Sequence, residues 1–149
     1  MRDKNHLVAF DPAADYPLGQ RRPDLVSTPS GLALDDVTLE ALRAGRMSWE
    51  DLRATPETLR YQAAVALAAG RAALAENLAR AAELAALSDE TVLGVYTALR
   101  PNRSSAADLD ALALHLEELG APLTAALVRE ASAAYAQRGL LETGEPAAV

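Results

Sequence analysis

The chain has 149 residues and a formal net charge of −7, so it is long enough for one domain with a core and too acidic for a phosphate-binding surface. Half of its residues are hydrophobic, but isoleucine and cysteine are absent and aromatic residues make up 4%. The alanine and leucine content predicts an all-α fold, without disulfides and without nucleic acid as a partner. No uncharged run approaches the roughly 18 residues of a membrane span, so we predict no membrane partner.

Residues 1–34 form what we call the arm, which lacks sustained periodicity and contains four prolines. Tyr16 and Leu18 are among its few apolar anchors. Such a segment is either a tail without fixed structure or an extended arm that becomes ordered on another subunit. The first helices are expected after it, within a helical domain spanning residues 35–141, and residues 142–149 are predicted to be a flexible tail.

Two short helical segments open this domain. We predict that Asp35 or Asp36 caps a short helix that ends near Gly45, and that Ser48 caps a turn carrying Trp49. Trp49 is the only tryptophan. It is either an interface anchor, since tryptophan is enriched in binding hot spots, or half-buried against this chain's own helices, which we favour.

A long helix is expected from Thr55 to Ala85, because Thr55 is a good N-cap and Pro56 suits the first helical position. Gly70 falls in its middle and predicts a kink or a close helix crossing. The apolar stripe of this helix comprises Leu59, Ala63, Leu67, Leu74, Leu78, Ala82 and Ala85.

The next helix is capped by Ser88 and ends before Pro101, which disfavours helical backbone in the preceding residue. Its expected apolar face comprises Val92, Val95, Tyr96 and Leu99. Arg100 and Arg103 flank the turn at its end. They can clamp carboxylates or carbonyls of a partner, or they can cap helix C-termini of this chain.

Two further helices complete the predicted compact bundle of about four to six helices. Ser105 and Asp108 form a capping box for the first, whose apolar positions are Leu109, Leu112, Leu116 and Leu119. Gly120 ends that helix, and the last helix runs from Pro122 to Gly139. We expect Arg129, beside Glu130, to form an internal ion pair.

Catalytic or metal-binding residues are not predicted. His115 lies on a helix without a neighbouring cysteine or second histidine, so we interpret it as a surface or half-buried residue. Adjacent acidic residues on a helix point about 100° apart and do not converge on one substrate atom. The sequence also lacks a Walker loop, a dinucleotide-binding turn and a nucleophile elbow.

The order and spacing of several motifs resemble the small (gamma) subunit of adenosylcobalamin-dependent diol and glycerol dehydratases. The most specific are Thr55-Pro56-Glu57-Thr58-Leu59-Arg60, Arg80-Ala81-Ala82-Glu83-Leu84 and Tyr96-Thr97-Ala98-Leu99-Arg100-Pro101-Asn102-Arg103-Ser104. Asp15-Tyr16-Pro17-Leu18, Thr38-Leu39-Glu40 and Val128-Arg129-Glu130-Ala131 support them. The resemblance at Asp15-Tyr16-Pro17-Leu18 favours an extended arm that is ordered on a partner subunit from Asp15 onward. Asn102 and Leu127 depart from the pattern, because the family usually has aromatic residues there.

The resemblance implies a non-catalytic subunit that packs on a large, barrel-shaped catalytic subunit. The family's holoenzyme is a dimer of heterotrimers with a large and a medium subunit, which hold adenosylcobalamin between them, and this chain would bind no cofactor alone. The holoenzyme converts 1,2-propanediol to propanal, or glycerol to 3-hydroxypropanal, with loss of water. Candidate interface residues are Tyr16, Leu18, Trp49, Arg100 and Arg103.

The alternative is a stand-alone acidic helical adaptor that binds another protein through the arm and its alanine-rich faces. Either protein would be cytoplasmic, as the lack of cysteine fits a reducing compartment. Some members of the family carry a long N-terminal extension linked to microcompartments. This sequence has no comparable extension, which favours the free cytoplasmic form.

Overall fold

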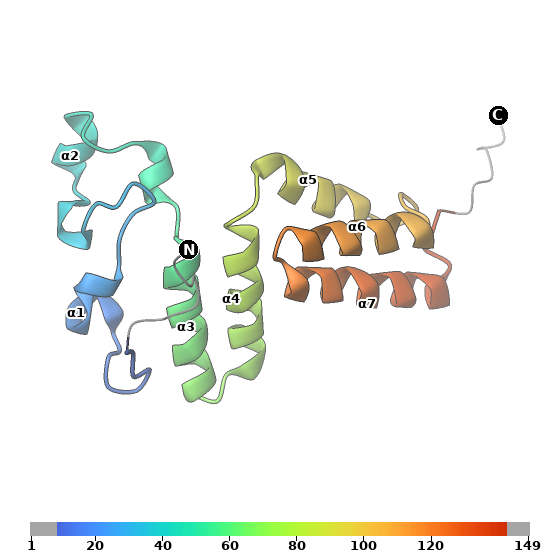
Figure 1. Cartoon of the computed structure of the whole chain (residues 1–149), viewed down its shortest axis with the longest axis horizontal. Coiled ribbons are helices and arrows are strands. Elements are labelled where there is room, and N and C mark those ends of the chain that lie inside the picture. Colours follow the sequence, from blue (N-terminus) through green and yellow to red (C-terminus); the bar gives the residue numbers. More distant parts are fainter. Residues whose placement is uncertain (1–8, 143–149) are drawn as a thin grey trace. The chain divides into compact units, whose positions relative to one another are not determined.

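The computed structural model describes residues 9–142, and these residues confirm the all-α prediction. They contain seven α-helices and no strand, with one isolated bridge between Ser27 and Ala33 (Figure 1). Five of the helices have ten residues or more, which matches the predicted number. The chain divides into two compact units, residues 1–85 (unit 1) and 86–149 (unit 2). The division falls inside the predicted 35–141 domain. The predicted tail, 142–149, lies outside the described residues except for Glu142.

The described part of the arm contains the short helix α1 (Leu18–Arg21) and the 3₁₀ turn η1 (Pro23–Leu25), and a second 3₁₀ turn, η2 (Leu34–Asp36), begins at its last residue. Arg22 holds it together, because its guanidinium donates to Asp15 Oδ2 at 3.1 Å, to the carbonyl of Ala9 at 3.1 Å and to Asp24. The ring of Phe10 packs edge-on against Tyr61 with centroids 4.8 Å apart. Residues 9–34 are therefore ordered by contacts within their own chain.

Helix α2 (Leu39–Arg43) begins later than predicted. Its cap is Thr38, whose Oγ1 accepts the Ala41 N–H at 3.1 Å, whereas Asp35 and Asp36 lie in η2. Thr38 has the extended backbone that an N-cap needs, with φ −127° and ψ 159°. The prediction of an Asp35 or Asp36 cap is wrong for that reason.

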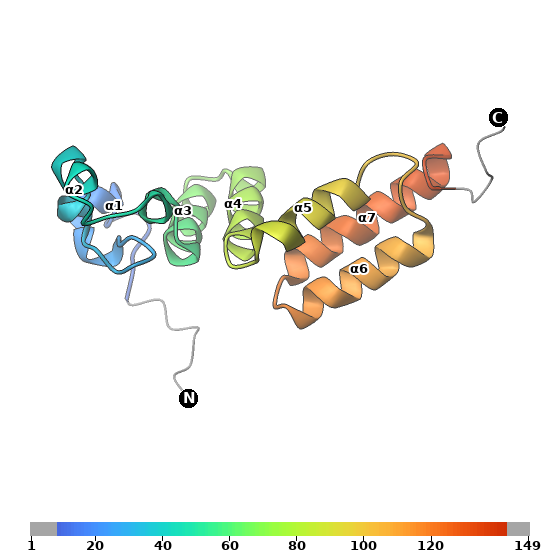
Figure 2. The ribbon, with the colours of Figure 1, turned by 90° about the horizontal axis from the view of Figure 1, so that it is seen from above.

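The predicted long helix is a helical hairpin, in which α3 (Pro56–Ala68) and α4 (Ala72–Leu84) lie side by side (Figure 2). Gly70 has φ 72°, in the left-handed region. It ends α3 in a Schellman motif, because the Arg71 N–H donates to the Ala66 carbonyl at 2.8 Å and the Gly70 N–H to the Leu67 carbonyl at 2.9 Å. Gly70 is thus a helix end and not a kink, and Thr55 caps α3 as predicted.

Small buried residues allow the two helices of this hairpin to approach closely. Ala66 on α3 faces the interior of unit 1 with Ala75 and Ala82 on α4. The predicted stripe is only partly buried, since Leu67 is 63% exposed and Leu74 is 44% exposed. The prediction that Leu67 and Leu74 lie on one apolar face is wrong, because the chain reverses direction between them.

Unit 2 contains α5 (Asp89–Ala98), α6 (Ala106–Glu118) and α7 (Pro122–Arg138), with α6 and α7 side by side. Its core comprises Val95, Leu109, Ala113, Leu116, Ala121, Ala125 and Val128. The predicted caps Ser88 and Ser105 are confirmed, as is the Gly139 end of α7. Tyr96 was expected on the buried face of α5 and is 63% exposed, because Val95 points into the core instead.

Candidate subunit interface

The buried carboxylate of Asp51 fixes the 3₁₀ turn η3 (Trp49–Leu52). Asp51 accepts the Ser48 N–H at 2.9 Å, in a capping box with the predicted cap Ser48, and the Ser30 N–H at 3.2 Å. These hydrogen bonds, from Ser30 first and from Ser48, lower the pKa of Asp51 to about 2. The carboxylate therefore joins the arm to η3.

Opposite that carboxylate, η3 presents an apolar surface. Trp49 and Leu52 lie three residues apart, which places them on the same side of a 3₁₀ turn, and they are 76% and 52% exposed. The prediction that Trp49 is half-buried against this chain's helices is wrong. Trp49 is exposed because Asp51 occupies the inward position of this turn. Its position suits the other prediction, an interface anchor.

The two candidates in the arm differ in exposure. Tyr16 is 59% exposed, whereas Leu18 is 8% exposed and packs within unit 1. Leu18 thus belongs to the packing that holds the arm, and Tyr16 is available to a partner.

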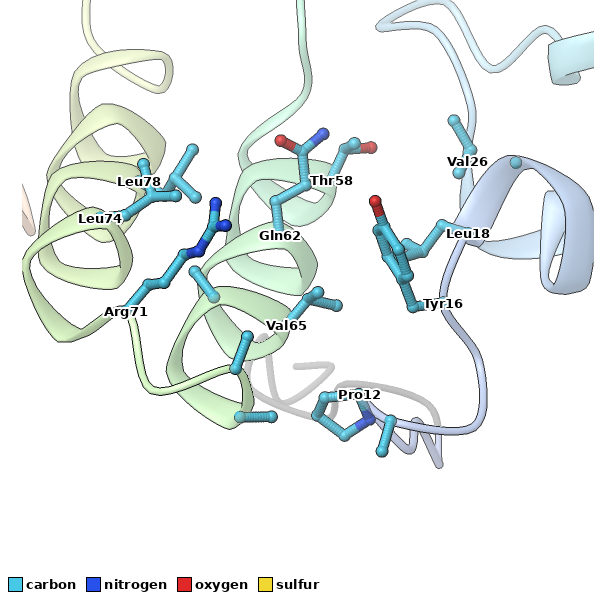
Figure 3. Close-up of a pocket in the computed structure, with 15 residues that line it drawn as sticks. Pro12, Tyr16, Leu18, Val26, Thr58, Gln62, Val65, Arg71, Leu74 and Leu78 are labelled. Carbon is cyan, nitrogen blue, oxygen red and sulfur yellow. The ribbon is translucent and has the colours of Figure 1, made fainter.

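A groove of about 920 Å³ lies in unit 1 between the arm and the α3–α4 hairpin (Figure 3). Figure 3 shows Tyr16, Leu18 and Val26 on the arm side, Thr58, Gln62 and Val65 on α3, and Arg71, Leu74 and Leu78 at α4. Most of this lining is apolar, and its polar side-chain groups come from Tyr16, Thr58, Gln62 and Arg71. Sequence reasoning missed the groove because it depends on contacts between the arm and helices more than 30 positions later.

The loop between α5 and α6 is held by four hydrogen bonds. Ser104 Oγ donates to the Ala98 carbonyl at 3.0 Å, and Tyr135 Oη donates to the Leu99 carbonyl at 2.6 Å. The Asn102 N–H donates to the Leu140 carbonyl at 2.8 Å, and the Glu142 N–H donates to the Ser104 carbonyl at 3.0 Å. Asn102 has φ 59°, which asparagine tolerates well. The loop is therefore rigid and closes against the end of α7.

Arg100 and Arg103 project from this loop and are exposed. The carbonyls at the end of α5 already accept hydrogen bonds from Ser104 and Tyr135, so neither arginine is needed to cap them. Neither guanidinium makes a hydrogen bond or ion pair with another residue in the range 9–142. Both groups are thus free to bind a partner's carboxylates.

Arg129 behaves as predicted and forms an internal ion pair, with Glu117 as its partner. Its Nη1 lies 2.6 Å from Glu117 Oε1, which connects α7 to α6. This hydrogen bond lowers the pKa of Glu117. The pair lies on the surface, so its energetic contribution is small.

Comparison with known proteins identifies the family. Residues 12–142 match the sequence profile of the family described as dehydratase small subunit. The chain belongs to the dehydratase small subunit family. It is 47% identical over 129 residues to the propanediol dehydratase small subunit of Citrobacter freundii, covering 86% of this chain and 75% of that protein. It is 46% identical over 130 residues to the propanediol dehydratase small subunit of Salmonella typhimurium strain LT2, covering 87% and 75%.

All five candidate interface residues lie within the range that matches the family, residues 12–142.

Among the described residues, groups that could support chemistry do not converge. His115 is a surface residue, as interpreted from the sequence, with Nδ1 3.7 Å from Glu118 Oε2. Residues 9–142 contain no group of three or more histidine, cysteine, aspartate or glutamate side chains that could hold a metal ion. None of the helices described is long and apolar enough for a membrane span.

Proposed function

We propose that this chain is the non-catalytic small subunit of a coenzyme B12-dependent diol or glycerol dehydratase, which it stabilises by packing on the large subunit. The observation that carries the proposal is the 47% identity to a propanediol dehydratase small subunit over 86% of the chain. The assembled enzyme would convert 1,2-propanediol to propanal and water, or glycerol to 3-hydroxypropanal and water. Its location in the cytoplasm stays a prediction.

The surface of the chain supports a structural role. Many large apolar side chains are 38–76% exposed, and apolar surface of this kind gains free energy when a partner covers it. They are Tyr16, Leu39, Trp49, Leu52, Leu67, Leu74, Leu93, Tyr96, Leu114, Leu119, Leu123 and Leu127. A subunit that binds only the folded complex stabilises it by mass action.

We assign no adenosylcobalamin site to this chain. His115 is the one histidine of this range, and it lies exposed on the surface of α6 without a cysteine or second histidine beside it. Its exposed position offers no enclosed polar site for a cofactor. We therefore assign the cofactor and the catalytic residues to the large and medium subunits, and we derive no catalytic step on this chain.

Co-expression with the matching large and medium chains tests the proposal. We expect the three chains to elute together, with a mass by light scattering close to a dimer of heterotrimers. If this chain elutes alone as a folded monomer while the other two chains assemble without it, the proposal is wrong. The adaptor hypothesis would then account better for its exposed apolar surface.

A further inference from the structure

The groove of unit 1 runs along one face of each helix of the hairpin. Four of its residues at α3 follow one another at positions i, i+4, i+7 and i+11, so they share one face of that helix. They are Thr58, Gln62, Val65 and Ala69. The residues at α4 repeat the pattern at positions i, i+3 and i+7, beginning at its N-cap. They are Arg71, Leu74 and Leu78. At about 1.5 Å per residue, the groove follows α3 for about 16 Å.

The arm forms the opposite wall, and contacts within this chain hold it in place. The guanidinium of Arg22 binds Asp15 next to Tyr16, and Leu18 is 8% exposed. Further along the arm, Ser30 donates its N–H to Asp51. The groove is therefore formed before a partner binds, so little conformational entropy is lost on binding.

Arg71 gives the groove a positive charge that no carboxylate balances. It is the one charged residue among those that line the groove, although the chain contains 21 aspartate and glutamate residues. Neither its guanidinium nor the amide of Gln62 makes a hydrogen bond or ion pair with another residue in the range 9–142. Figure 3 shows both groups pointing into the space between α4 and Tyr16. An occupant that brings a carboxylate gains a charge-assisted hydrogen bond there.

The exposed apolar side chains of the groove indicate that its occupant is a protein. Tyr16 is 59% exposed and Leu74 is 44% exposed, and both line the groove. Small-molecule sites bury most of the surface of their ligand, which an open groove of this kind does not. A partner protein can fill the groove and cover these side chains at the same time.

We propose that this groove binds a short apolar segment of the large dehydratase subunit, with one aspartate or glutamate of the segment on Arg71. This inference rests on the proposed function, which assigns the large subunit as the partner. An extended chain advances about 3.3 Å per residue, so about five residues span the groove. A second copy of this chain fits poorly, because two chains of net charge −7 repel each other.

Charge reversal tests the role of Arg71. An acidic side chain is favourable at a helix N-terminus, and Arg71 is the N-cap of α4, so Arg71→Glu should keep the wild-type circular dichroism spectrum. We expect it to weaken binding to the co-purified large and medium chains by about ten-fold or more. The control, Arg43→Glu on α2, makes the same charge change at another exposed arginine and should bind like wild type. Similar affinities of the two variants would overturn the proposal.

Filling the groove tests the apolar contact. Ala69 and Ala73 are both exposed, but only Ala69 lines the groove, so Ala69→Trp adds bulk inside it and Ala73→Trp adds the same bulk outside it. Both variants should keep the wild-type circular dichroism spectrum. We expect Ala69→Trp to bind the large and medium chains about ten-fold or more weakly and Ala73→Trp to bind like wild type. The reverse ranking, or equal binding by both, would contradict the proposal.

A benzophenone-bearing phenylalanine in place of Tyr16 identifies the occupant within the complex. We expect crosslinks to an apolar peptide of the large subunit that contains aspartate or glutamate. Crosslinks confined to a second copy, to the medium subunit or to this chain itself would overturn the inference. If the wild-type chain does not assemble with the other subunits at all, the proposed function fails and the inference with it. If it assembles, and Arg71→Glu and Ala69→Trp bind like wild type, only the inference fails.

Discussion

Asp51 is the residue whose ionisation most directly affects the presentation of Trp49. Its folded pKa of about 2 lies below the usual value of 3.8, because Ser30 and Ser48 donate hydrogen bonds to the carboxylate. A lowered pKa means that the ionised group stabilises the folded state above pH 3.8 and that this contribution is lost as the pH falls through about 2.

We therefore expect the urea concentration at the unfolding midpoint to decrease as the pH is lowered from 4 to 2. At pH 7, Asp51→Asn should be less stable than wild type. Circular dichroism follows the transition, since the described residues are helical. The variant should show a flatter pH profile over the same interval. A variant with the wild-type midpoint at pH 7 would show that the carboxylate does not stabilise this turn.

Leu116 tests the core of unit 2. Its side chain is 0% exposed between α6 and α7, so Leu116→Ala should lower the free energy of unfolding by about 2–5 kcal/mol through lost burial and a residual cavity. Leu114 lies on the same helix and is 58% exposed. Leu114→Ala should cost less than about 1 kcal/mol. Urea unfolding followed by circular dichroism measures both, and similar losses would contradict this assignment of the core.

At the scale of the elements, two glycines have opposite roles. Gly70 has φ 72° at the end of α3, and alanine there should destabilise the hairpin by about 1 kcal/mol. Gly94 has helical backbone and open space around it, so Gly94→Ala should stabilise the free chain by about 1 kcal/mol. Thermal unfolding of the two variants measures the difference. A lower melting temperature for Gly94→Ala would contradict the helical assignment at that position.

The helices themselves could largely be predicted from the sequence, because caps and stops are local. Ser88, Ser105 and Gly139 act where their side chains and backbone preferences indicated. The hairpin at Gly70 could not be predicted, because leucines seven residues apart on either side of the turn continue the same periodic pattern. A glycine in that pattern is compatible with a kink, a crossing or a reversal, and the choice depends on the tertiary packing of α3 against α4.

The candidate site was predictable in part for similar reasons. Pro101 indicated a helix end, so a turn carrying Arg100 and Arg103 followed from local sequence. The exposure of Trp49 did not follow from local sequence. It depends on the inward position of Asp51, which accepts a hydrogen bond from Ser30, 21 positions earlier. Helical periodicity likewise could not decide which of the neighbours Val95 and Tyr96 points into the core.

At the scale of the whole molecule, Trp49 should matter to assembly and not to folding. Because its side chain is 76% exposed, Trp49→Ala should change the stability of the isolated chain by less than about 0.5 kcal/mol. In the complex, we expect it to weaken binding by about 2 kcal/mol or more, as buried interface tryptophans do. Gln137→Ala, exposed on α7, is the control. Competition binding against labelled wild-type chain measures both, and equal affinities would remove Trp49 from the interface.

We expect this chain to contribute to the assembly of a dehydratase and not to its chemistry. The most direct test is to titrate the purified chain into its large and medium partners and to measure adenosylcobalamin-dependent aldehyde formation alongside the fraction of complex assembled. We expect activity to rise in parallel with assembly, and activity per assembled complex to be constant, also for His115→Ala. Full activity without the chain, or a loss of activity in His115→Ala complexes that assemble normally, would contradict it.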